Sequence, residues 1–272
     1  MWKSVLPLIL LCVKRSCRIL ALVFLAIWLL PAGCQSPIPV SQAGNRAAII
    51  DQLCLRESNP AFIAGATQLL ESCGFTVDIF QGAQVNVDLY RKLPSLGYRF
   101  ILLRVHSGLL VSIENGRETT LDTTYLFTAE NYTATRYAAD QLTDKVSNAM
   151  MEDNSPLVFA VNSAFIQSAK GTFDQTIVLA MGCESYEYDD LPRAFIEKGA
   201  AAYIGWSGLV SLEHVDSVTL DLLRNLCSGN MTLDEGISQS TGSLGKDPYF
   251  GSFLRYYPAA SGNLTIAKLA RR

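Results

Sequence analysis

The residues best suited to chemistry are a cysteine and a histidine, each of which ends an apolar run. Cys183 closes the segment TIVLAMGC (176–183), and His106 stands near the end of FILLRVHSG (100–108). Both runs are aliphatic, rich in branched residues and bounded by turn signals, which predicts buried strands. In open α/β sheets, ligands bind at the carboxyl ends of the strands. The pattern therefore predicts a thiol and an imidazole at such an edge.

These two side chains suit nucleophilic catalysis. If their strands are neighbours, about 4.8 Å apart, the imidazole of His106 can orient or deprotonate the thiol of Cys183. The backbone N–H groups of Gly108 and Cys183 can then hold an oxyanion. A helix that starts straight after Cys183 would favour the thiolate, whereas the carboxylate of Glu184 would raise the pKa of the thiol. The structural alternative is two ordinary residues at strand ends, because buried free cysteine is common.

The elements before His106 alternate between strands and helices. Strands are expected over 46–55, 75–82 and 100–106, with helices from Asn59-Pro60 to Cys73-Gly74 and near Val87–Leu93. This alternation predicts a parallel sheet. The fold class expected is a three-layer α/β/α sandwich with a mainly parallel sheet, and with a hairpin inserted after the third strand around 114–116. Asp51, in the first strand, is either a partnered core carboxylate or an edge residue.

The elements after the hairpin follow a looser order. Helices are expected over 135–151, 191–199 and 214–229, and a further one from Thr232, which has capping-box spacing with Glu235. Strands are expected over 156–166, 176–183, 201–208 and 252–258. His214, at a helix start, reads as a surface or capping residue.

The first 34 residues read as a signal peptide or membrane anchor, residues 35–45 as a tether, and residues 46–272 as the α/β domain. Ile19–Leu30 is an unbroken apolar run that suits a signal sequence and is short for a spanning helix. PAGC (31–34) resembles the lipobox of prokaryotic lipoproteins, with Cys34 as the lipidated residue, although Pro31 departs from that motif. A lipidated Cys34, an uncleaved anchor and ordinary signal cleavage remain open. Each predicts an extracytoplasmic domain, and the first two anchor it to a membrane.

Composition narrows the classes of protein. The chain has 272 residues, 49% hydrophobic and 17% charged, which suffices for one large domain. A pI near 5.5 without a basic patch argues against nucleic acid as a partner. The cysteines and histidines are dispersed, so no metal site is expected, and no nucleotide-binding motif suggests a cofactor. Disulfides are permitted outside the cytoplasm, but no pairing can be assigned.

The segment 178–216 resembles the C-terminal half of the caspase-haemoglobinase fold, and it is most similar to the gingipain and CHAT-type branches. FILLRVHSG resembles the strand that delivers the catalytic histidine of that fold. The resemblance implies His106 as general base and Cys183 as nucleophile, with Trp206, Ser207 and Gly208 in the strand that borders the substrate pocket. Asp216 matches an acidic position of the CHAT-type branch. Ser107 departs from the family, which has glycine directly after the histidine.

The function expected is therefore an extracytoplasmic, membrane-tethered cysteine peptidase that hydrolyses peptide bonds with a His106/Cys183 dyad. Its partners would be a peptide or protein substrate and the membrane. The alternative is a catalytically inactive surface lipoprotein that keeps a caspase-like fold to bind a peptide or protein.

Overall fold

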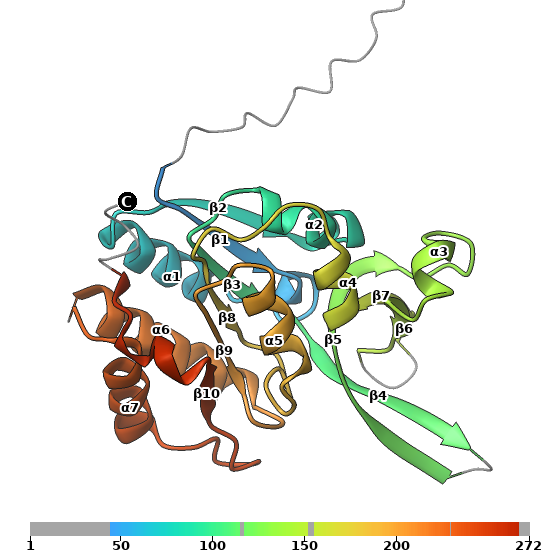
Figure 1. Cartoon of the computed structure of the whole chain (residues 1–272). Helices are drawn as coiled ribbons and strands as arrows, with labels where there is room; N and C mark the ends of the chain where they lie inside the picture. The colour runs from blue at the N-terminus through green and yellow to red at the C-terminus, as the bar shows by residue number, and fades with distance from the viewer. Residues whose placement is uncertain (1–43, 115–116, 152–154, 229, 267–272) are drawn as a thin grey trace, which may run out of the picture. The chain divides into compact units, whose positions relative to one another are not determined.

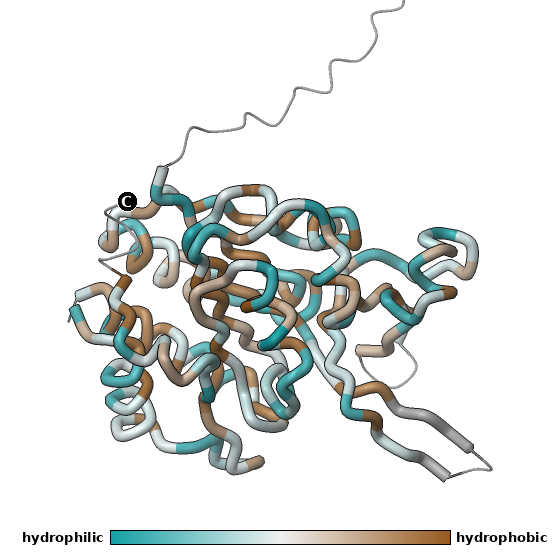
Figure 2. Tube along the Cα trace, in the orientation of Figure 1, coloured by the Kyte–Doolittle hydropathy of each residue, from teal (hydrophilic) through white to brown (hydrophobic). Residues whose placement is uncertain are grey.

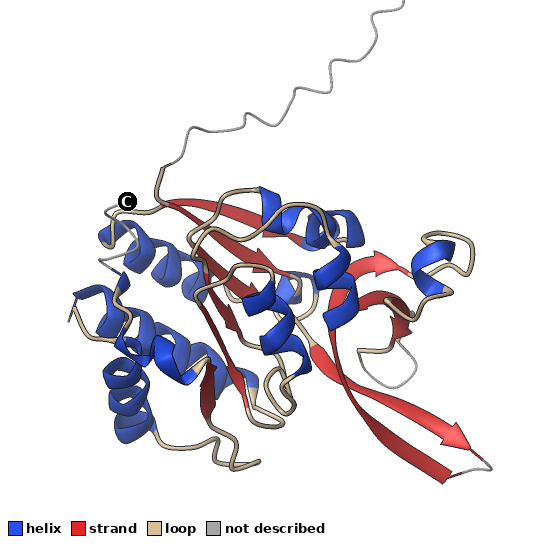
Figure 3. Cartoon of the chain, in the orientation of Figure 1, coloured by secondary structure: helices blue, strands red, loops and turns tan. Residues whose placement is uncertain are grey.

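The computed structural model of this chain describes residues 44–114, 117–151, 155–228 and 230–266. The predicted leader, Cys34 and nearly all of the predicted tether lie outside the described residues. The described part is an α/β fold with a mainly parallel six-strand sheet flanked by helices, together with a four-strand antiparallel sheet (Figures 1 and 3). The predicted fold class is confirmed.

The six-strand sheet has the order β2-β1-β3-β8-β9-β10, and only β10 runs antiparallel to its neighbour. The apolar runs that predicted strands form its central members, β1, β3, β8 and β9, whose residues are almost all buried. The strands are β1 (Arg46–Asp51), β2 (Thr76–Gln81), β3 (Phe100–Arg104), β8 (Ile177–Ala180), β9 (Ala202–Trp206) and β10 (Leu254–Tyr257).

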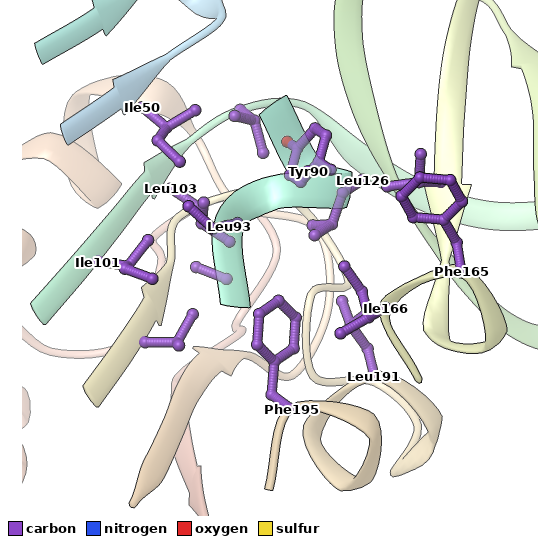
Figure 4. Packing of buried hydrophobic residues seen from close by; sticks show 14 of the residues in the cluster. Ile50, Tyr90, Leu93, Ile101, Leu103, Leu126, Phe165, Ile166, Leu191 and Phe195 are labelled. Atoms are coloured by element: carbon purple, nitrogen blue, oxygen red, sulfur yellow. The ribbon is translucent and has the colours of Figure 1, made fainter. Parts of the chain in front are cut away.

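Helices cover both faces of this sheet (Figure 1). One buried cluster joins the sheet to α1 (Pro60–Ser72), α6 (Leu212–Ser228) and α7 (Leu233–Leu244). The other cluster joins it to α2 (Val87–Lys92), α4 (Ser163–Ser168) and α5 (Asp190–Glu197). Figure 4 shows the second cluster, where aromatic and aliphatic side chains from the sheet and these helices interlock. Apolar residues concentrate accordingly along the strands and the inner faces of the helices (Figure 2).

Side-chain caps set the predicted starts of two helices. The side chain of Asn59 accepts a hydrogen bond from the Phe62 N–H at 3.0 Å, and Pro60 occupies the first turn of α1, where its missing N–H costs nothing. Thr232 and Glu235 form the predicted capping box of α7. Both helices therefore begin where the sequence predicts.

The insertion after β3 is larger than a hairpin. β4 (Ser107–Glu114) and β5 (Arg117–Asn131) form the predicted hairpin, which extends away from the six-strand sheet in Figure 1. β5 also pairs with β7 (Val158–Asn162), and β7 pairs with β6 (Val146–Ala149). These four antiparallel strands make the second sheet.

Two predicted elements after the hairpin are wrong in part. The helix expected over 135–151 is reduced to α3 (Ala138–Gln141), because Tyr137 and Asp144 adopt left-handed φ angles of 56° and 54°, and the chain then turns into β6. The strand expected over 156–166 ends at Asn162, whose side chain accepts a hydrogen bond from the Phe165 N–H at 3.1 Å and caps α4. Tertiary pairing and a side-chain cap override the local apolar pattern in these two places.

A disulfide joins Cys73, at the end of α1, to Cys227, in the last turn of α6. Such a bond is typical of proteins that fold in an oxidising compartment outside the cytoplasm. Cys54 and Cys183 are the free cysteines among the described residues. No helix in the described ranges has the length and apolar character needed to cross a membrane.

Candidate active site

Three strand ends lie side by side at the carboxyl edge of the six-strand sheet. β8 pairs with β3 in parallel, with Leu103 opposite Ala180, and β3 pairs with β1 in the same sense. Cys183 follows the end of β8 by three residues, and His106 follows the end of β3 by two. The predicted neighbourhood of the two strands is therefore correct. Along this edge the order is Cys183, then His106, then Gln52 after β1.

The thiol of Cys183 is half-buried against the loop that follows β9. Its Sγ accepts a hydrogen bond from the Val210 N–H at 3.5 Å and lies 3.6 Å from the Val210 carbonyl oxygen. Burial raises the pKa of the thiol most strongly. The Val210 N–H lowers this pKa, while the charges of Glu184 and Asp247 raise it further. Burial and the nearby carboxylates therefore favour the protonated thiol.

The helix expected directly after Cys183 is absent from that position. Residues 183–189 form turns, and α5 begins only at Asp190. Glu184 adopts a left-handed φ of 54°, and its N–H donates to the Gly208 carbonyl oxygen at 2.8 Å. These contacts hold the segment against the end of β9. The predicted effect of a helix N-terminus on the thiol therefore loses its premise, because no helix starts directly after Cys183.

His106 is fixed through both of its backbone polar groups. Its N–H donates to the side-chain oxygen of Gln52 at 2.9 Å, and its carbonyl oxygen accepts from the Phe127 N–H at 2.9 Å. The imidazole ring packs on the ring of Phe127, with centroids 6.2 Å apart, and borders a cavity. Preorganised backbone of this kind is what a catalytic side chain needs.

The segments that carry the two residues contact each other through Ser107. Its hydroxyl donates to the carbonyl oxygen of Cys183 at 2.5 Å. Gly182 packs against this contact so closely that a Cβ atom there would lie 2.6 Å from the Val105 carbonyl oxygen. Ser107 thus joins the segment that carries His106 to the segment that carries Cys183.

Gly108, the predicted oxyanion donor, lies beside the side chain of Glu184. The carboxylate of Glu184 accepts a hydrogen bond from the Leu109 backbone, and burial raises the pKa of this carboxyl. The carboxylate is thus a neighbour of the backbone expected to hold an oxyanion, and that role of Gly108 and Cys183 stays a prediction.

The predicted pocket residues lie on the other side of Cys183, at the end of β9. Trp206 is only 1% exposed and belongs to the core cluster, where its ring packs on His214 with centroids 5.7 Å apart. Ser207 exchanges two hydrogen bonds with Phe253, and the carbonyl of Gly208 receives the Glu184 N–H. Their assignment to a substrate pocket stays a prediction, and the ring of Trp206 packs in the core.

A buried charged cluster at the end of β3 was not predicted from the sequence. Arg104, the last residue of β3, is fully buried and contacts Asp216 through Nε at 3.0 Å and Asp51 through Nη1 at 2.9 Å. Its Nη2 also donates to the Glu57 carbonyl at 3.0 Å. Asp51 is therefore a partnered core carboxylate. The sequence does contain a signal for this cluster, because a charged residue ends each of the apolar runs FILLR and RAAIID.

Within the described ranges, no three His, Cys, Asp or Glu side chains are grouped so that they could hold a metal ion. No protein-family model matches the sequence, and no curated protein is significantly similar to it. The assignment of function therefore depends on the geometry of the site.

Proposed function

We propose that this protein is a cysteine peptidase with a caspase-haemoglobinase-type domain, in which Cys183 is the nucleophile and His106 the general base. The observation that supports the proposal is the parallel pairing of β3 with β8, because His106 and Cys183 follow the ends of these two neighbouring strands. The contact between Ser107 and Cys183 supports it, because it ties the two segments together.

The raised pKa of the Cys183 thiol bears on when the proton is transferred in the proposed mechanism. A thiol that is protonated at neutral pH gives up its proton to His106 as it attacks the substrate carbonyl, rather than standing beforehand as a thiolate. The backbone amides of Gly108 and Cys183 would stabilise the resulting oxyanion. Membrane attachment through a lipid on Cys34 or through an uncleaved anchor is part of the same proposal.

Electrophile labelling followed by mass mapping tests the dyad. We expect a peptide electrophile to label Cys183 selectively at pH 7, and His106→Ala to reduce the rate by roughly 100-fold or more, the usual range for loss of a general base. Cys54→Ala is the matched control, because Cys54 is the other free cysteine in the described ranges and its pKa is also raised by burial. Equal labelling of the wild type and His106→Ala would contradict the proposal.

The second candidate is an inactive binding protein with the same fold. The observation that favours it is the thiol itself, which packs on the core cluster and is held by the Val210 backbone. For such a protein, simple alkylation of Cys183 should depend on pH only through the thiol, rising about tenfold per pH unit between pH 7 and 9. Its rate should not change in His106→Ala.

A further inference from the structure

A small cavity borders His106 at the carboxyl edge of the sheet. Its volume is about 170 Å³, which gives room for one aliphatic side chain. Its polar lining consists of Gln52, Arg56, His106 and Asn131. The apolar lining comes from the turn after β1, from β5, from the start of β7 and from the chain before it, and consists of Leu53, Leu55, Ala129, Met151, Pro156 and Val158.

The strand order places this cavity on one definite side of the proposed dyad. Cys183 follows β8, His106 follows β3, and Gln52 and Leu53 follow β1, so the cavity lies on the β1 side of His106. Cys183 lies on the β8 side. A substrate that contacts both Cys183 and the cavity must therefore cross the segment that carries His106.

The chemistry of peptide hydrolysis determines which part of the substrate lies at Cys183 and which part lies at His106. The sulfur forms a bond to the carbonyl carbon, and His106 takes up the thiol proton. When the carbon–nitrogen bond breaks, His106 gives that proton to the leaving amine, and the acyl group stays on the sulfur until water displaces it. The leaving amine must therefore lie over His106, and the residue that carries it continues away from Cys183.

We propose that the cavity beside His106 binds the side chain of the residue that follows the scissile bond, and that it selects an aliphatic side chain there. This inference rests on the proposed peptidase function. It adds the substrate class, namely peptides with a valine-, leucine-, isoleucine- or methionine-sized residue on the leaving-group side.

Gln52 fixes the cavity relative to His106. Its side chain is 2% exposed, and its oxygen accepts the His106 N–H. Its amide nitrogen donates to the Thr128 carbonyl oxygen at 3.4 Å and to the sulfur of Met151 at 2.9 Å. One buried amide therefore joins the imidazole-bearing segment to the cavity wall, so that the two keep a constant separation.

The first test is cleavage of a mixed peptide library by the purified domain, with the new amino termini identified by mass spectrometry and Cys183→Ala as background. We expect aliphatic first residues to exceed glycine and alanine by roughly tenfold or more. Ala129→Leu fills the cavity and should remove this preference while leaving the preference on the acyl side unchanged. Ala138→Leu, on the exposed α3, is the matched control and should behave as the wild type.

A second measurement does not depend on cleavage. The chain has two histidines, so the imidazole NMR signals of Cys183→Ala can be assigned with His214→Gln. Leucinamide should shift the His106 signals at concentrations at least tenfold below those required for glycinamide, and Ala129→Leu should abolish the difference. Cys183-dependent cleavage without a preference at this position overturns the inference and leaves the peptidase. A leucinamide shift without cleavage contradicts the peptidase, and with it the role of the cavity in cleavage, and leaves only a cavity that prefers an aliphatic group. The absence of both contradicts the peptidase and the cavity's preference together.

Discussion

The hydroxyl of Ser107 donates a hydrogen bond of 2.5 Å to the backbone carbonyl of Cys183. Ser107 follows His106 directly, so this bond joins the two segments on which the proposed chemistry depends. It also explains why Gly182 precedes the cysteine, because a side chain there would displace Ser107.

Gly182→Ala should therefore destabilise the domain and disturb the candidate site. The added methyl group would collide with the Ser107 hydroxyl and lie 2.6 Å from the Val105 carbonyl oxygen. Overpacking of this kind costs about 1–3 kcal/mol of unfolding free energy, measurable by chemical denaturation. Gly242→Ala, in α7 with no atom within 4 Å of the new Cβ, is the control and should be neutral or stabilising. Equal effects of the two substitutions would refute this account of Gly182.

Arg104→Met should be much more costly than the loss of a surface ion pair. The substitution leaves the buried carboxylates of Asp51 and Asp216 without their cation, which costs about 3–5 kcal/mol. Arg193→Met breaks a pair with Asp189 in which the arginine side chain is 57% exposed, and it should cost at most about 1 kcal/mol. Urea denaturation of both variants would compare them, and similar losses would mean that the buried cluster is not structurally important.

Asp247 should contribute to the acid sensitivity of the domain. Its burial by itself would raise the pKa, but hydrogen bonds from Ser211, Phe250 and Tyr249 outweigh burial and lower the pKa to about 2. The unfolded value is near 3.9. Because the folded pKa is depressed, the stabilisation is complete above about pH 4 and disappears as the pH falls towards 2.

The measurement is thermal unfolding of the wild type and Asp247→Asn between pH 2.5 and 6. The wild type should be the more stable at pH 6, and the difference should shrink towards pH 2.5. Ser211→Ala, which removes one of the donors, should have a smaller effect in the same direction. A difference that is independent of pH would show that the charge of Asp247 is not the stabilising feature.

The disulfide should stabilise the domain substantially. The Cys73–Cys227 bond has a sequence separation of 154 residues, and removing a native disulfide typically costs about 2–5 kcal/mol. The double variant Cys73→Ala/Cys227→Ala should unfold at lower denaturant concentration than the wild type. Dithiothreitol should destabilise the wild type and leave the double variant unchanged. A wild type that is insensitive to reduction would contradict the expectation.

Much of the fold follows from the sequence, because the central strands are short apolar runs between turn signals. The placement of His106 and Cys183 at one edge could be predicted for the same reason. The turns after Cys183 could not, since they depend on the backbone of Glu184 pairing with Gly208, a contact between distant segments. The role of Gln52 could not be predicted either, because its hydrogen-bond partners are distant in the sequence. They are Thr128 in β5, Met151 and His106.

Helices α1 and α6 run side by side and are fastened at both of their ends. At one end, the side chain of Asn59 donates to Asp216 at 2.9 Å, and Asp216 also receives Arg104 from the sheet. At the other end, the disulfide between Cys73 and Cys227 joins the two helices covalently. Because both ends are fixed, we expect α1 and α6 to move as one rigid unit. Access of a substrate to Cys183, whose thiol packs on the same buried cluster as these helices, should therefore not require the two helices to separate.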